Sequence, residues 1–207
     1  TPIFNIEQME AFNQISDKRL SPLMGEYNQA VEALASEYRE LFPKHLHKDA
    51  DRMCNHLFNG MYSVIIDYAH TPDALENVLK TLREIAPDHE LICLFGCGGD
   101  RDRTKRPEMA AIAQKLADRI IVTSDNSRTE KTSDIMADIK AGMDLNGRSR
   151  SLFIEDREEA IRTAIMIAGQ GATILLAGKG HETYQIIGKE KRHFDEKEIV
   201  TEIFRTL

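Results

Sequence analysis

The chain has 207 residues, 42% of them hydrophobic, which is enough to bury the core of one large domain, or of one domain with an extension. Its formal net charge of −7 argues against general nucleic-acid binding, because a phosphate backbone attracts an excess of cations. No apolar run approaches the ~20 residues of a membrane-spanning helix, and no secretory signal is evident. We therefore expect a cytoplasmic protein with no membrane span and no nucleic-acid partner.

The cysteine pattern argues against a disulfide framework. The chain contains Cys54, Cys93 and Cys97, an odd number without Cys-x-x-Cys spacing, which fits a reducing compartment. Cys93 lies inside an apolar run and is expected in the core. A tetrahedral metal site needs four ligands, and no partner cluster for Cys93 and Cys97 is visible, so we predict no metal site.

Residues 1–50 differ in character from the rest and form a predicted N-terminal extension that is mostly helical. Apolar side chains recur on one face of residues 29–42, and Pro43 ends this pattern. His45 and His47 could bind a metal ion, but a surface turn is the favoured interpretation. Residues 51–207 are predicted to form the main domain.

From residue 62 onward, short apolar runs alternate with amphipathic segments. The predicted strands span residues 62–66, 91–95, 119–123, 151–154 and 173–177. The predicted helices begin at Pro72 after the N-cap Thr71, at Glu108, at a cap formed by Ser133, and at the capping boxes Asp156-x-x-Glu159 and Asp195-x-x-Glu198. Residues 184–187 and 192–194 indicate a short hairpin. This order predicts an α/β fold, a Rossmann-like, doubly wound, mainly parallel sheet with a helical N-terminal extension.

Four polar or glycine-rich segments follow predicted strands. They span residues 67–70, 96–107, 124–128 and 178–182. Because parallel strands end at the same edge of a sheet, these loops are expected to share one rim, where such folds bind ligands. Their convergence is the main evidence for a site.

The loop at 96–107 combines three glycines with four cations, Arg101, Arg103, Lys105 and Arg106. Glycines allow close approach of a ligand, so the loop indicates an anion site, with a solvated charge run as the alternative. Its spacing is not that of a dinucleotide fingerprint, and the segment 178–180 is not a P-loop. Neither a dehydrogenase nor a self-sufficient nucleotide triphosphatase is supported.

Charges of both signs are expected on facing loops. Arg101 and Arg128 suit carboxylates, whereas Asp125 and Glu182, with Asn126 beside them, suit an ammonium group. This combination fits an amino-acid zwitterion. The alternative is an Arg–Asp surface network without a ligand.

Asp67 and His70 flank the first strand-to-helix turn. A carboxylate and an imidazole at this position can bind ribose hydroxyls, phosphates or a metal-bound nucleotide. The alternative is that Asp67 bonds local amides and His70 packs on the sheet edge.

Four motifs in the right order resemble the C-terminal domain of the Mur ligases, in particular the UDP-N-acetylmuramoyl-tripeptide synthetase branch. They are Asp-Tyr-Ala-His-Thr-Pro-Asp-Ala-Leu-Glu (67–76), Gly-Gly-Asp-Arg-Asp-x-x-Lys-Arg-Pro (98–107), Asp-Asn-Ser-Arg-Thr-Glu (125–130) and Ala-Gly-Lys-Gly-His-Glu (177–182). The resemblance covers about residues 52–207. It implies an ATP-dependent acid–amino-acid ligase of peptidoglycan biosynthesis, and hence of cell wall biogenesis, cell shape and cell division. In that family the carboxylate of UDP-MurNAc-L-Ala-D-Glu becomes an acyl phosphate, which the incoming amino group attacks.

The resemblance assigns ligand-binding roles but no catalytic residue within this chain. It implies ATP contacts by Arg52, Asp67 and His70. It implies that the incoming diamino acid is held by Arg101, Asp125, Asn126, Arg128, Gly178 and Glu182. In the family, the arginine at Arg128 marks meso-diaminopimelate rather than lysine, which lacks the second carboxylate. Lys105 and Arg106 are then expected as charges at the start of a helix, near the nucleotide.

The chain departs from the family pattern at several positions. Ser127 stands where the family usually has proline, and Asp51 and Cys54 replace a glycine and a glutamate around Arg52. The family's P-loop, modified lysine and UDP-binding domain lie upstream, and residues 1–50 do not supply them. We therefore expect sites for ATP, Mg²⁺ and UDP-MurNAc-dipeptide to be completed by N-terminal and central ligase domains. The isolated chain is expected to bind diaminopimelate weakly and ATP very weakly, without turnover.

Two other functions fit the same residues. One is a non-catalytic module that binds diaminopimelate or muropeptides. The other is a related ligase for another amino acid, such as lysine or glutamate.

Overall fold

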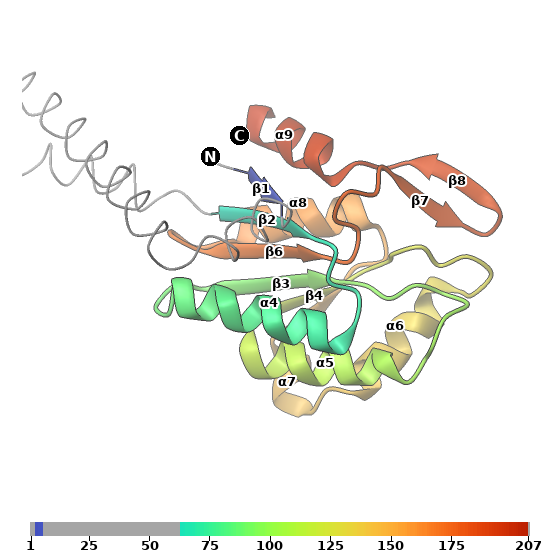
Figure 1. Cartoon of the computed structure of the whole chain (residues 1–207), viewed down its shortest axis with the longest axis horizontal. Helices are drawn as coiled ribbons and strands as arrows, with labels where there is room; N and C mark the ends of the chain where they lie inside the picture. The colour runs from blue at the N-terminus through green and yellow to red at the C-terminus, as the bar shows by residue number, and fades with distance from the viewer. Residues whose placement is uncertain (1–2, 6–62, 207) are drawn as a thin grey trace, which may run out of the picture.

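The computed structural model describes residues 3–5 and 63–206. Within them, parallel strands form one sheet in the order β1-β2-β6-β3-β4-β5 (Figure 1). The strand bounds are β1 Ile3–Asn5, β2 Ser63–Asp67, β3 Leu91–Phe95, β4 Arg119–Val122, β5 Ser151–Phe153 and β6 Thr173–Ala177. A separate antiparallel hairpin pairs β7 (Tyr184–Ile187) with β8 (Glu190–His193).

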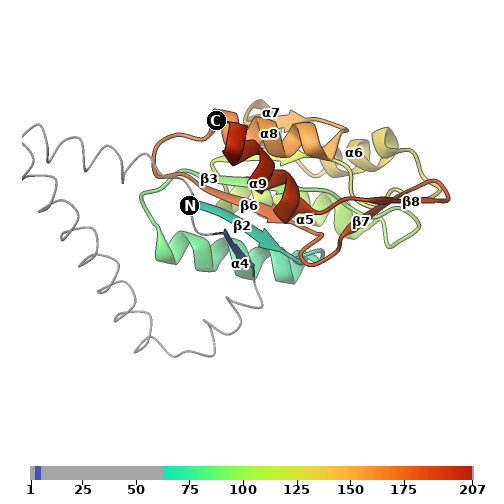
Figure 2. The same cartoon turned by 90° about the horizontal axis from the view of Figure 1, so that it is seen from above.

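Helices cover both faces of the sheet, as expected for strands with apolar side chains on both sides. One face carries α4 (Pro72–Ile85), α5 (Lys105–Leu116), α6 (Thr132–Ala141) and α7 (Leu145–Ser149). The other carries α8 (Arg157–Ile167) and α9 (Glu196–Thr206), which lie side by side (Figure 2). Alternate residues along each strand enter the two cores, so Cys93 packs toward α4 and α5 while Ile92 and Leu94 pack toward α8. The predicted fold class and the core position of Cys93 are confirmed.

Local sequence signals determine where most of the helices begin. At α4, Thr71 Oγ1 accepts a hydrogen bond from the Ala74 amide at 3.3 Å, and Pro72 occupies the first turn. At α8, the Asp156 carboxylate accepts from the Glu159 amide at 2.9 Å. Asp195 caps α9 in the same way, accepting from the Lys197 amide at 2.8 Å. These predicted helix starts are confirmed.

Several predicted boundaries are wrong. Helix α5 begins at Lys105 rather than Glu108, because Pro107 is tolerated in a first turn, where amides have no intrahelical partner. Ser133 is not a cap, since α6 begins at Thr132 and the N-cap position is Lys131, two residues before Ser133. Helix α7, capped by Asp144, was not predicted. The second hairpin strand is Glu190–His193 rather than 192–194, and β1 adds a strand to the predicted five.

The predicted helical extension, the pair His45 and His47, and Arg52 lie outside the described residues. Within the described part, no helix is both long and apolar enough to cross a bilayer.

Candidate functional site

The four predicted loops lie together at one rim of the sheet. Their strands are neighbours in the order β2-β6-β3-β4, and all four run parallel, so the loops emerge side by side. The β7–β8 hairpin projects from the same end of the molecule (Figures 1 and 2). The prediction that these loops converge is confirmed.

Lys179 lies at the centre of this rim and is fully buried. Its ammonium Nζ donates to Tyr184 O at 2.7 Å and to Asn126 Oδ1 at 3.2 Å. It also lies 3.3 Å from Asp125 Oδ1 and 3.5 Å from Glu182 Oε2. One buried cation therefore joins three of the predicted acceptor-binding residues.

The amide of Asn126 has a defined orientation. Its Oδ1 accepts from Lys179 Nζ and, at 2.9 Å, from the Ile186 amide, so the oxygen faces two donors. Its Nδ2 donates to Glu182 Oε2 at 3.0 Å. One of the two Nδ2 hydrogens is used by Glu182, and the other has no partner among the described residues. The amide nitrogen of Asn126, a donor, is therefore directed toward Glu182, and its oxygen toward Lys179 and the hairpin.

Arg128 is held by backbone carbonyls at one end of its guanidinium group. Nη1 donates to Gly99 O at 2.9 Å and to Asn126 O at 3.2 Å. Its backbone is bound to β7 on both sides, since its amide donates to Ile186 O and its carbonyl accepts from the Gly188 amide. Nε and Nη2 donate no hydrogen bond within residues 63–206. That edge of the fork is available for a carboxylate.

Arg101 lies beside Arg128 across Gly98. A Cβ added at Gly98 would lie 2.9 Å from Arg128 Nη1 and 3.7 Å from Arg101 Cγ. Arg101 is exposed, and its Nη1 donates to the neighbouring Asp100 O at 2.9 Å. The two arginines thus face each other as predicted, with Arg128 held more firmly than Arg101.

Gly178 and Tyr68 border the acidic side of the site. Gly178 has a φ of +118°, which disfavours any side chain, and a Cβ there would lie 3.8 Å from Asp125 Oδ2. The pKa of the Tyr68 phenol is raised by burial and by the negative charges of Glu182 and Asp125. Tyr68 therefore keeps its proton at neutral pH and can donate a hydrogen bond.

Asp67 and His70 occupy the adjoining loop between β2 and α4. Asp67 Oδ1 accepts from the Ala69 amide, and His70 Nδ1 is 2.8 Å from Tyr68 O. Lys105 Nζ donates to His70 O at 2.8 Å, which attaches the start of α5 to this loop. The Tyr68 ring lies 4.6 Å from the ring of His70 and 5.1 Å from that of His181. The residues predicted to contact a nucleotide therefore adjoin those predicted to hold an amino acid.

Arg106 corrects the expectation of a charge near the nucleotide. Its side chain is fully buried, and it donates to both Glu130 oxygens, to Asp138 Oδ2 and to Gly98 O. A guanidinium group can be buried here because two carboxylates and a carbonyl accept from its Nη1 and Nη2, while Nε is buried with no partner among the described residues. Arg106 therefore joins the loop after β3 to α6 and is not accessible to a ligand.

Acid is expected to weaken this cluster. Hydrogen bonds from Arg106 lower the pKa of Glu130 from 4.5 to about 2. A pKa depressed by folding stabilises the protein above the unfolded value, and this contribution is lost as pH falls toward about 2. In denaturant unfolding at several pH values, the stability difference between wild type and Glu130→Gln should be largest near neutrality and vanish on acidification. A difference independent of pH would contradict this assignment.

Two further buried residues, Arg157 and Gln185, hydrogen-bond the strand ends and the loop that form the rim. Arg157 pairs with Glu196 at 2.8 Å and donates to Ser124 O and Ala177 O, at the ends of β4 and β6. Gln185 of β7 donates to Ser124 Oγ at 2.9 Å and to Asp125 O at 3.2 Å. The hairpin and α9 are therefore bound to the loop that carries Asn126 and Arg128.

Sequence reasoning missed Lys179, Tyr68 and Gln185 as members of this group. Lys179 had a signal, a lysine between two glycines after a strand, and it lies inside the motif at 177–182, but neither the P-loop pattern nor the resemblance gave it a role. Tyr68 lies inside a recognised motif. Gln185 carries no sequence signal, because its partners are 60 and 61 residues away.

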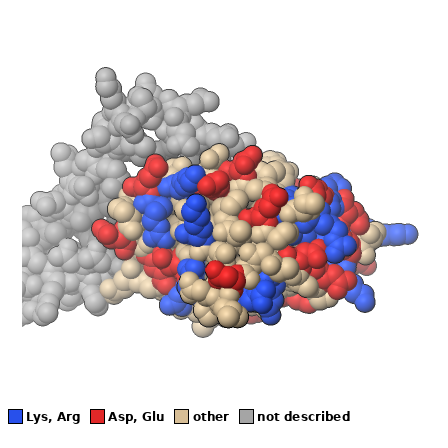
Figure 3. Space-filling view, turned by 90° about the horizontal axis from the view of Figure 1, so that it is seen from below, with Lys and Arg blue, Asp and Glu red and all other residues tan. Residues whose placement is uncertain are grey.

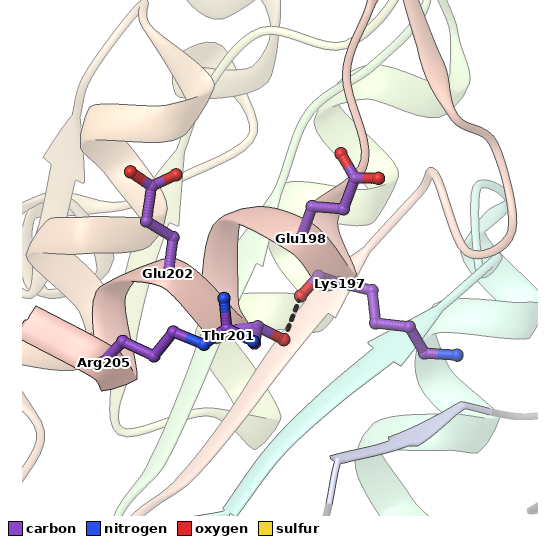
Figure 4. A pocket seen from close by; sticks show the side chains of 5 residues that line it. All are labelled: Lys197, Glu198, Thr201, Glu202 and Arg205. Carbon is purple, nitrogen blue, oxygen red and sulfur yellow. Dashed lines mark hydrogen bonds between the residues drawn. The ribbon is translucent and has the colours of Figure 1, made fainter.

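Surface charge at the rim is mixed. Lys and Arg side chains gather at the end of the molecule that carries the hairpin, with Asp and Glu among them (Figure 3). A separate surface hollow lies along α9, lined by Lys197, Glu198, Thr201, Glu202 and Arg205 (Figure 4). None of the predicted site residues lines it, and the Thr201 hydroxyl donates to Lys197 O within the helix.

Comparison with known proteins identifies the family of this chain. Residues 51–180 match the family model described as Mur ligase, glutamate ligase domain. The UDP-N-acetylmuramoyl-L-alanyl-D-glutamate–2,6-diaminopimelate ligase of Clostridioides difficile (strain 630) is 47% identical over 185 residues, covering 85% of this chain and 37% of the relative. That of Synechococcus elongatus is 59% identical over 136 residues, covering 66% and 27%.

A solved structure of a ligase with the same name aligns with a TM-score of 0.65 and 46% identity, covering 69% of this chain and 29% of that one. The chain thus spans about a third of the length of the curated relatives it matches. Because the family model matches more than half of the residues, the chain belongs to the Mur ligase family.

Proposed function

We propose that this chain is the acceptor-binding domain of an ATP-dependent ligase that adds meso-diaminopimelate to UDP-MurNAc-L-Ala-D-Glu in peptidoglycan synthesis. The observation that carries the proposal is the separation of charge at the rim. Arg128 and Asn126 offer donors on one side, and Glu182 and Asp125 offer carboxylates on the other. The C. difficile and S. elongatus relatives are named as diaminopimelate ligases, which agrees with this chemistry.

The charged groups of meso-diaminopimelate match the charged groups of this arrangement. Diaminopimelate carries an ammonium and a carboxylate at each end, whereas lysine lacks one carboxylate. We assign that extra carboxylate to the open edge of Arg128, with Arg101 beside it and the second Nδ2 hydrogen of Asn126. The ammonium group at the same end pairs with Glu182, next to Asp125 and Gly178. Tyr68 closes the site toward the nucleotide side.

The described residues also fit one side of an ATP site. His70 is exposed, Lys105 is bound to the same loop, and Asp67 lies beneath them. When bound, ATP supplies the phosphoryl group that activates the substrate carboxylate. The residues of this chain orient the attacking amine toward that carboxylate and border the nucleotide. Mg²⁺ and the UDP-MurNAc-dipeptide belong to the part of the site that other domains complete, and Arg52, which lies outside the described residues, is proposed as a further contact to ATP.

Calorimetry with the purified chain tests the acceptor site. We expect weak binding of meso-diaminopimelate and weaker binding of lysine. Arg128→Ala should lower the affinity for diaminopimelate by about 10- to 150-fold, the effect of one lost charge-assisted hydrogen bond. Arg192→Ala is the matched control, because Arg192 is an exposed hairpin arginine paired only with Glu190 among the described residues. Equal affinity for lysine and diaminopimelate would favour a ligase for another amino acid.

A chimera separates an enzyme domain from a binding module. The corresponding segment of the C. difficile ligase would be replaced by residues 51–207, and diaminopimelate-dependent ADP release would be measured. Activity that Arg128→Ala lowers and Arg192→Ala preserves is the expected result. A folded chimera that binds diaminopimelate but forms no product would favour the non-catalytic module.

A further inference from the structure

We propose that Lys179 is a positioning residue that determines which side of the acceptor site donates hydrogen bonds and which side accepts them. The proposal rests on the proposed function for the identity of the ligand. It concerns a residue to which the family resemblance gave no role.

Lys179 cannot act on a ligand directly. Its side chain has no exposure to solvent, and its ammonium group is enclosed by Tyr184 O, Asn126 Oδ1, Asp125 and Glu182. The rings of Tyr184 and Phe194 lie 5.9 and 5.8 Å from Nζ. Lys179 therefore lies below the surface that a ligand would contact. It can affect a ligand only through the residues that it holds, Asn126, Asp125 and Glu182.

The first consequence concerns the orientation of Asn126. An amide side chain can rotate by 180° and exchange its oxygen and nitrogen. Here Lys179 Nζ and the Ile186 amide both donate to Oδ1, which leaves Nδ2 directed at Glu182. The site is thereby given an N–H donor beside Arg128, which suits a carboxylate and not an ammonium group.

The second consequence concerns the two carboxylates. Asp125 and Glu182 come from different loops and both lie within 3.5 Å of Lys179 Nζ. Without a cation between them, two nearby carboxylates repel each other. With Lys179 between them, this repulsion is offset and Glu182 keeps its position for an incoming ammonium group.

A purely structural role for Lys179 predicts a different result. If Lys179 only stabilised the fold, its loss would reduce the fraction of folded protein, while the folded molecules would bind every ligand as before. A positioning role instead changes the affinity of the folded protein and its preference between diaminopimelate and lysine. The preference is affected because only diaminopimelate presents a carboxylate to the donor side.

The test is calorimetry of the full chain with meso-diaminopimelate and with lysine. Lys179→Met removes the charge and keeps the length of the side chain. We expect the dissociation constant for diaminopimelate to rise about 10-fold or more and the preference over lysine to shrink, at unchanged circular dichroism. Lys191→Met is the matched control, since it removes an exposed cation from the neighbouring hairpin. Unchanged preference in folded Lys179→Met would overturn the proposal.

A double-substitution cycle tests whether Lys179 acts through Asn126. Asn126→Ala removes both the side-chain oxygen and the N–H groups, so no amide orientation remains to be set and no new charge is added beside Glu182. We expect Lys179→Met to change diaminopimelate affinity much less in this background than in wild type. Equal effects in both backgrounds would overturn the assignment. If Lys179→Met does not fold, Lys179→Gln removes the charge and keeps a donor of similar reach, and a diaminopimelate affinity equal to wild type would overturn the role assigned to the Lys179 charge between Asp125 and Glu182.

Nuclear magnetic resonance of the ligand-free chain separates this proposal from the proposed function. The side-chain amide hydrogens of Asn126 should exchange slowly in wild type and Lys191→Met, and faster in Lys179→Met. If wild type binds no diaminopimelate, the proposed function fails, while this exchange difference still supports the positioning role. Identical exchange in all three proteins would overturn the positioning role, whatever the binding result.

Discussion

Replacing Arg106 by methionine is expected to lower the free energy of unfolding by about 3 kcal/mol, near the lower end of the range for breaking a buried ion pair. Arg106 is fully buried, and its guanidinium group pairs with Glu130 and Asp138 at 2.8 Å each. Methionine fills much of the space but leaves two carboxylates without their shared cation. They are 21% and 28% exposed and regain some hydration, which limits the loss. Urea unfolding of the purified variant and of the wild type measures this difference in the free energy of unfolding.

Arg103→Ala is the matched control for this measurement. Arg103 pairs with the same Asp138, at 2.9 Å, but its side chain is 63% exposed. An exposed ion pair contributes only about 0–1 kcal/mol, so its loss should be small. Equal losses for Arg103→Ala and Arg106→Met would show that burial does not distinguish the two arginines. A large loss confined to Arg106 would identify it as the support of the loop after β3.

Replacing Gly99 by alanine is expected to cost about 3 kcal/mol, at the upper end of typical overpacking. A Cβ at Gly99 would lie 1.9 Å from Ser127 O and 2.8 Å from Ser127 C, which are backbone atoms. The Gly99 amide also donates to Asn126 O at 2.9 Å, and the Gly99 carbonyl accepts from Arg128. The segment 126–128 would have to move, so we expect diaminopimelate affinity to fall together with stability.

Gly169→Ala supplies the comparison. A Cβ there would meet only the end of the Glu90 side chain, at 3.2 Å, which can move aside. Its unfolding free energy should stay within about 1 kcal/mol of wild type, and its ligand affinity should not change. If Gly99→Ala were as stable as Gly169→Ala, the close approach of the two loops would not be a constraint on this site.

Local sequence determined much of this molecule by itself. Runs such as Leu91–Phe95 form strands because β-branched and apolar residues can be buried on both faces, and the caps at Thr71 and Asp156 act within three residues. The order of strands and helices was sufficient to place the four loops at one rim, because parallel strands share a direction. Boundaries were less certain where a signal was weak, as at Ser133.

Tertiary structure alone decided the state of the charged residues. Arg106 and Arg103 belong to one cationic run, yet one is buried and the other exposed. Arg106 pairs with both Glu130 and Asp138 of distant segments, whereas Arg103 pairs with Asp138 from the solvent side. Lys179 is likewise buried by partners that include Asn126, 53 residues away. Burial of a charge depends on which distant groups can satisfy it, and a local pattern contains no record of them. The sequence therefore placed the four loops together, and the packing decided which of their charged side chains are buried.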